Sequence, residues 1–147
     1  MTADPRVAIE QVQLADRHWS DALEASVEAP PDLEFAQRVR AIAKAAEQEA
    51  AALRLADALG LALRPHPGAR NMQLSYELRP GAPSRRGPPE LWARFDRAVA
   101  ELGEALEGVA LSAIARAFGE LSEILRELAD EIERIDFPAA ARRRAAR

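Results

Sequence analysis

One long heptad repeat near the C-terminus constrains the fold of this chain more than any other feature. Between residues 111 and 135, apolar side chains recur at alternating steps of three and four, the spacing of one helix face with coiled-coil periodicity. The members of this row are Leu111, Ile114, Phe118, Leu121, Leu125, Leu128, Ile132 and Ile135. The flanking positions are small or apolar: Ala110, Ala115, Ala117, Ser122, Ile124 and Ala129. Such a wide stripe predicts a bundle helix, 111–136, that contacts two or three other helices.

Three earlier segments show the same periodicity and predict helices over 5–29, 31–63 and 89–108. Asp4-Pro5 begins the first, because aspartate caps a helix and proline fits its first position. Its expected buried face is Ile9, Val12, Ala15, Trp19, Ala22, Leu23 and Val27. In the second helix the face is Phe35, Val39, Ile42, Ala46, Leu53 and Ala56, beside Ala36, Ala43 and Ala50. In the third it is Trp92, Phe95, Val99, Leu102, Leu106 and Val109.

The last two helices cannot be continuous. Val109 ends one apolar row and Leu111 begins the next, and two residues correspond to about 200° of helix rotation. We therefore expect a turn over 107–112, with Gly108 following the third helix in a left-handed conformation and Ser112 capping the fourth.

Residues 64–88 are rich in proline and glycine and predict a long crossover without a helix. Inside it, Met72, Leu74, Tyr76 and Leu78 alternate with polar residues, which predicts one short β-strand over 72–78. A lone strand leaves its backbone donors and acceptors unpaired. One hypothesis is therefore that the strand pairs with the same strand of a second copy across a twofold axis. The alternative is an extended loop with hydrated edges.

Basic residues gather in the crossover and the tail, although the net charge of the chain is −4. We expect residues 139–147 to form a flexible Arg-rich tail. The candidate interaction residues are the four apolar strand residues, Met72, Leu74, Tyr76 and Leu78, and the arginines Arg79, Arg85, Arg86, Arg142, Arg143 and Arg144. Intramolecular pairing with the acidic helices is the alternative for these arginines.

The sequence contains no catalytic or cofactor motif. Cysteine is absent, neither histidine belongs to a Glu-x-x-His pair, and residues 80–87 lack the Gly-Lys-Ser of a phosphate-binding loop. The residues around Gly119 have helix-turn-helix spacing, but the face after the glycine is acidic, which favours a continuous helix. No polar residue is expected within the apolar rows. We therefore expect no catalytic residue, cofactor or metal.

These patterns predict an all-α fold, an antiparallel four-helix bundle of two helical hairpins, with residues 1–138 as a single domain. The expected function is that of a non-catalytic helical interaction module, acting through homo-oligomerisation, as a homodimer, and through binding of a protein partner. A nucleic-acid-associated regulatory protein that uses the basic loop and tail is the first alternative. An enzyme or small-ligand binder is the second. The absence of a long apolar run predicts a cytoplasmic protein with no membrane-spanning segment.

Overall fold

The computed structural model of the chain describes residues 4–28, 35–63, 78–83, 85–136 and 138–146. These residues form helices and connecting turns, with no strand among them. The helices are α1 (Pro5–Glu28), α2 (Phe35–Ala58), α3 (Pro89–Glu107), α4 (Leu111–Asp136) and α5 (Pro138–Ala145). The predicted all-helical fold is confirmed, and the first four helices lie close to their predicted positions.

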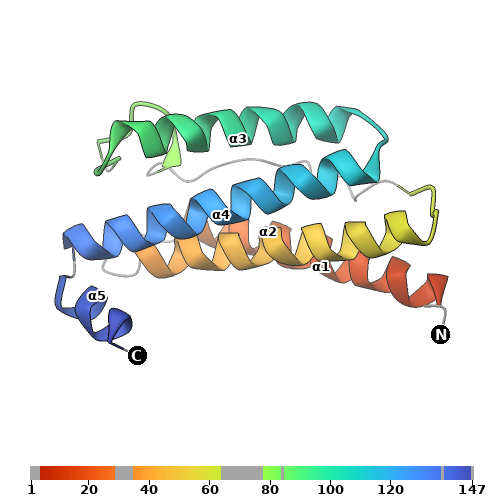
Figure 1. The fold of residues 1–147 in the computed structure, drawn as a ribbon, viewed down its shortest axis with the longest axis horizontal. Helices are drawn as coiled ribbons and strands as arrows, with labels where there is room; N and C mark the ends of the chain where they lie inside the picture. Colours follow the sequence, from red (N-terminus) through yellow and green to blue (C-terminus); the bar gives the residue numbers. More distant parts are fainter. Residues whose placement is uncertain (1–3, 29–34, 64–77, 84, 137, 147) are drawn as a thin grey trace.

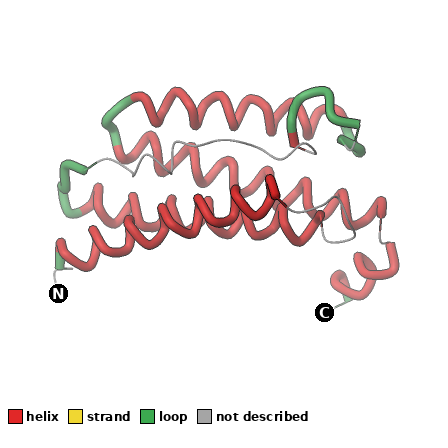
Figure 2. The backbone as a smooth tube through the Cα atoms, turned by 180° about the vertical axis from the view of Figure 1, so that it is seen from behind, coloured by secondary structure: helices red, strands yellow, loops and turns green. Residues whose placement is uncertain are grey.

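Helix α4 lies at the centre of the bundle. It packs against α2, α3 and α5, while α1 packs against α2. Figure 1 shows α3 above α4 and the α1/α2 pair below it, and Figure 2 shows the same order from behind. The prediction that the last long helix contacts two or three others is therefore confirmed.

The contact between α2 and α4 forms the core, as the wide apolar stripe of α4 predicts. The α4 residues of its apolar row are buried except Ile135, and Ala115 and Ala129 beside the row are fully buried. All of the predicted α2 face is buried as well. The hydroxyl of Ser122 donates a hydrogen bond of 2.8 Å to the carbonyl oxygen of Ala43, so the two backbones come close where both helices have small side chains. Helix α4 continues through Gly119, as expected for a bundle helix.

Three members of the predicted apolar rows are exposed: Ile9, Val109 and Ile135, the last of them 38% exposed. Ile9 is 40% exposed and Ala8 is buried in its place, one residue along α1. Val109 is 67% exposed, because α3 ends at Glu107. Trp19 of α1 is one of its core residues, and its ring meets that of Phe118 edge-on with a centroid distance of 5.2 Å. This pair links α1 directly to α4.

The helix ends follow local backbone chemistry. The Asp4 carboxylate accepts a hydrogen bond of 2.9 Å from the amide of Arg6, which confirms the predicted N-cap of α1. Helix α2 ends at Ala58, earlier than predicted, because Gly60 takes a positive φ of 67°. The amide of Leu61 then bonds the carbonyl of Ala56 at 3.0 Å and that of Gly60 bonds Asp57 at 2.9 Å, the two bonds of a Schellman motif.

The predicted turn between α3 and α4 is present, but its details differ. Gly108 is extended rather than left-handed, with φ −88° and ψ −175°. Helix α4 already begins at Leu111, and the carbonyl of Ala110 accepts hydrogen bonds from the amides of Ala113 and Ile114. Ser112 therefore lies inside the first turn and does not cap α4.

The crossover and the tail depart from the predictions in different ways. Residues 72–77 of the predicted strand lie outside the described residues, and Leu78 begins a turn as a fully buried core residue. The tail, predicted to be irregular, contains α5, which packs on α4. Proline at its first position and a run of alanine and arginine favour this short helix. Figure 1 shows α5 turned away from the end of α4.

The central core gives a first test of this fold. Leu125 is 1% exposed in the middle of α4, so Leu125→Ala should lower the free energy of unfolding by about 2–5 kcal/mol through lost burial and a residual cavity. Glu127→Ala is the control, since its ion pair with Arg94 is exposed and such pairs contribute about 0–1 kcal/mol. Urea denaturation measures both, and equal losses would contradict the burial of Leu125.

Candidate functional site

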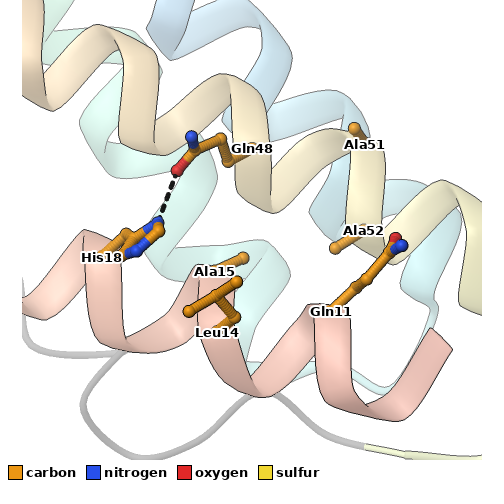
Figure 3. A pocket seen from close by; sticks show the side chains of 7 residues that line it. All are labelled: Gln11, Leu14, Ala15, His18, Gln48, Ala51 and Ala52. Carbon is orange, nitrogen blue, oxygen red and sulfur yellow. Dashed lines mark hydrogen bonds between the residues drawn. The ribbon is translucent and has the colours of Figure 1, made fainter. Parts of the chain in front are cut away.

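A groove of about 330 Å³ lies between α1 and α2 on the outside of the bundle. Figure 3 shows its seven lining residues, four from α1 and three from α2: Gln11, Leu14, Ala15, His18, Gln48, Ala51 and Ala52. At one end Nδ1 of His18 lies 2.9 Å from the side-chain oxygen of Gln48, a hydrogen bond that joins the two helices. Alanines form much of the rest, and Leu14 is 44% exposed. None of the seven is aspartate, glutamate, lysine or arginine.

The groove belongs to a second heptad pattern on each helix, which we call the outer rows. On α1 the outer row is Val7, Gln11, Leu14, His18, Asp21 and Ala25. On α2 it is Gln37, Ala41, Lys44, Gln48, Ala51, Leu55 and Ala58. These residues step by three and four, as the core rows do, but all are exposed or half-buried. Only Asp21 and Lys44 are charged, although 30% of the chain is charged.

The corresponding surface between α3 and α4 is different. Its two adjoining hollows, of about 160 and 440 Å³, are lined largely by charged residues: Arg94, Arg97, Glu101, Glu104, Arg116 and Glu120. Slight desolvation and the neighbouring carboxyl of Glu101 raise the pKa of Glu120 above its usual value. A surface with so many charged side chains is expected to remain exposed to solvent. The α1/α2 and α3/α4 pairs thus present opposite kinds of surface.

A pair of carboxyl groups lies inside the bundle beneath α1. Glu49 of α2 is fully buried and Asp16 of α1 is 4% exposed. The prediction that no polar residue enters the apolar rows is therefore wrong. The signal was present in the spacing, because Glu49 occupies the step between Ala46 and Leu53 at which the α2 row otherwise lacks a member.

Burial, followed by the hydrogen bond and the charge of Asp16, raises the pKa of Glu49 to about 10. Neither carboxyl oxygen of Glu49 accepts a hydrogen bond from a described donor. Two ionised carboxylates can only accept hydrogen bonds, so their contact becomes a hydrogen bond when one of them holds a proton. The raised pKa means that Glu49 favours its protonated form at neutral pH.

This charge state predicts a pH dependence of stability. The folded chain keeps the Glu49 proton up to about pH 10, whereas the ordinary pKa is 4.5. Between these values the folded state binds more protons than the unfolded state, so stability falls as the pH rises. Glu49→Gln removes this titration, and its stabilising effect should be about 1–3 kcal/mol larger at pH 8 than at pH 6.

Denaturant unfolding at the two pH values measures the effect. Glu10→Gln, an exposed position on the same helix as Asp16, is the control and should show little change with pH. A Glu49→Gln effect that is the same at both pH values would show that Glu49 is ionised in the folded chain.

Arg85, one of the predicted interaction residues, is held within the fold. Its guanidinium donates to both carboxylate oxygens of Asp96, at 2.8 and 2.6 Å, and to the carbonyl of Leu78 at 2.7 Å. It also lies 4.7 Å from the ring centre of Trp92, and its side chain is only 11% exposed. These contacts fasten Leu78 and Arg85 to α3. Arg85 thus follows the alternative of intramolecular pairing with an acidic helix.

Loss of this anchor should destabilise the fold. Arg85→Met keeps an apolar stem but leaves Asp96 and the Leu78 carbonyl without their donor, and we expect a loss of about 1–3 kcal/mol. Arg97→Met, an exposed change on the same helix as Asp96, should stay within about 0.5 kcal/mol. Thermal unfolding compares the two variants, and similar melting temperatures would contradict an anchoring role.

The other predicted interaction residues do not gather at one site among the described residues. Arg79 and Arg86 are exposed at the end of the crossover, whereas Arg142 and Arg143 are exposed on α5. Leu78 is in the core. Met72, Leu74 and Tyr76 lie outside the described residues, as does the side chain of Arg144. Sequence reasoning missed the α1/α2 groove, because the outer rows contain few of the large apolar residues that reveal a helix face.

Comparisons with known proteins found no match for this chain among family models, curated proteins or solved structures. Within the described ranges, histidine and acidic residues form no group of three or more that could hold a metal ion. In the same part of the chain, no helix combines the length and the apolar character needed to cross a membrane.

Proposed function

We propose that this protein is a non-catalytic helical interaction module that acts through homo-oligomerisation and through binding of a protein partner. The observation that supports this proposal is the uncharged groove between α1 and α2. The cores of protein interfaces are depleted in charged residues, and helix pairs associate through heptad rows like the outer rows of α1 and α2. The charged surface between α3 and α4 has neither property.

We further infer that the four long helices form an antiparallel bundle. Contacts between α2 and α4 support this arrangement. Arg40, near the start of α2, bonds Asp130 at 2.9 Å near the end of α4, whereas Arg54, near the end of α2, approaches Gly119 in the first half of α4. In this arrangement the α1/α2 hairpin carries the groove and the α3/α4 hairpin carries the charged hollows, on separate sides of the α2/α4 contact.

Light scattering on the purified protein tests the oligomeric state. The monomer mass is 16.1 kDa, and we expect twice this mass at micromolar concentration. A monomer at that concentration would contradict homo-oligomerisation.

The groove is tested by a charge placed at Leu14, its exposed large apolar residue. Leu14→Glu should convert the dimer to a monomer, since it buries a carboxylate in the contact. Val109→Glu is the matched control, because Val109 is also exposed and apolar but lies at the α3–α4 turn. Circular dichroism should show that both variants keep their helices.

The predicted strand over 72–78 is the competing route to a dimer. Leu74→Pro removes a backbone donor and should disrupt strand pairing, but it should leave a groove-mediated dimer intact. If Leu74→Pro were monomeric and Leu14→Glu dimeric, the strand rather than the groove would form the interface.

A further inference from the structure

We propose that the α1/α2 groove docks the same groove of a second copy about a twofold axis parallel to the helices, so that α1 of each copy lies along α2 of the other. This inference rests on the proposed function and adds to it the orientation of the two copies. It follows from the positions of the outer-row residues along the helix axes, which we call their heights, and from the positions of the two charged residues, Asp21 and Lys44.

The contacts across the groove give these heights. His18 lies beside Gln48 at one end of the groove, and Gln11 lies near Ala52 at the other, so residue numbers increase in opposite directions on the two helices (Figure 3). One outer-row step beyond His18 is Asp21, and one step before Gln48 is Lys44. The two charges of the outer rows therefore lie at the same height, on opposite sides of the groove.

A twofold axis parallel to the helices exchanges the two sides of the groove and keeps every height. It places Asp21 of each copy opposite Lys44 of the other copy, which gives two ion pairs of opposite charge. It also places Leu14 of each copy opposite Ala51 of the other, a large side chain against a small one. All the charges of the outer rows are thus paired.

A twofold axis across the helices gives a worse contact. It would place α1 of one copy against α1 of the other, and α2 against α2, with the heights reversed. With the axis at the height of Leu14, for example, Asp21 would face Val7 and Lys44 would face Ala58. Each charge would then lose water without gaining an opposite charge, which is costly. The charge pattern therefore selects the parallel axis.

The contact area is adequate for a specific dimer. Two helices, each about 10 Å wide and paired over about 30 Å, present roughly 600 Å². Specific interfaces bury about 600–1,000 Å² on each partner. The interface is therefore expected at the small end of this range. In an interface of this size, the gain or loss of two ion pairs should change the dissociation constant measurably.

Charge reversal with mixing tests the orientation. In a dimer of the Asp21→Lys variant, both Asp21–Lys44 ion pairs become contacts between two lysines. In a dimer of the Lys44→Asp variant, both become contacts between two aspartates. Each variant should dissociate roughly tenfold more readily than the unmodified protein, as expected for two exposed pairs. An equimolar mixture restores both opposite-charge pairs in the heterodimer, so its dissociation constant should return to within about threefold of the original. Sedimentation equilibrium at low salt measures all three samples.

The matched control is Glu104→Lys, the same kind of reversal on the charged α3/α4 surface, and its dimer should be unchanged. A dimeric unmodified protein whose variants dimerise normally, or whose mixture stays as weak as its components, would overturn this orientation and leave the proposed function standing. A monomeric unmodified protein would overturn both.

Discussion

The close contact between α2 and α4 is the interaction on which the rest of the structure depends. Both helices bury small residues along this contact, including Ala43 and Ala46 on α2 and Ala115 and Ala129 on α4, all fully buried. The 2.8 Å hydrogen bond from Ser122 to the Ala43 carbonyl is possible only because no larger side chain separates the backbones. Helices α2 and α4 thus form a central pair, with α1 packed against α2 and α3 packed against α4.

The parts of the fold that the sequence predicts well are those in which one helix face is apolar along its whole length. The wide stripe of α4 and the alanine-flanked row of α2 satisfy this condition, and the structure buries both. In α1 the row is less well defined, because Ala8 and Ile9 both fit the periodicity and only the neighbouring helix decides which is buried. The helix α5 was missed for another reason: the alanine and arginine run was read as a charged tail, although both residues favour helices.

Buried acids are difficult to predict because a sequence pattern marks apolar positions and treats a gap as accidental. Glu49 fills such a gap in the α2 row, and Asp16 lies three residues before Trp19 in α1. Ion pairs pose a related problem. Asp130 has arginines four residues away on both sides, at 126 and 134, yet Arg126 bonds Glu47 and Arg40 bonds Asp130. Local spacing shows which pairs are possible, but the packing of helices determines which form.

Helix α1 has two unusual features on opposite faces. Its inner face contributes Asp16 to the carboxyl pair, whose burial costs stability unless Glu49 keeps its proton. Its outer face is a row in which Asp21 is the only charged residue, beside the alanines of α2. Apart from Trp19 against Phe118, α1 relies on its contact with α2, whereas α2 and α4 support each other directly. A partner that covers the outer rows would contact α1 and α2 together, so its binding energy would stabilise the contact between these two helices.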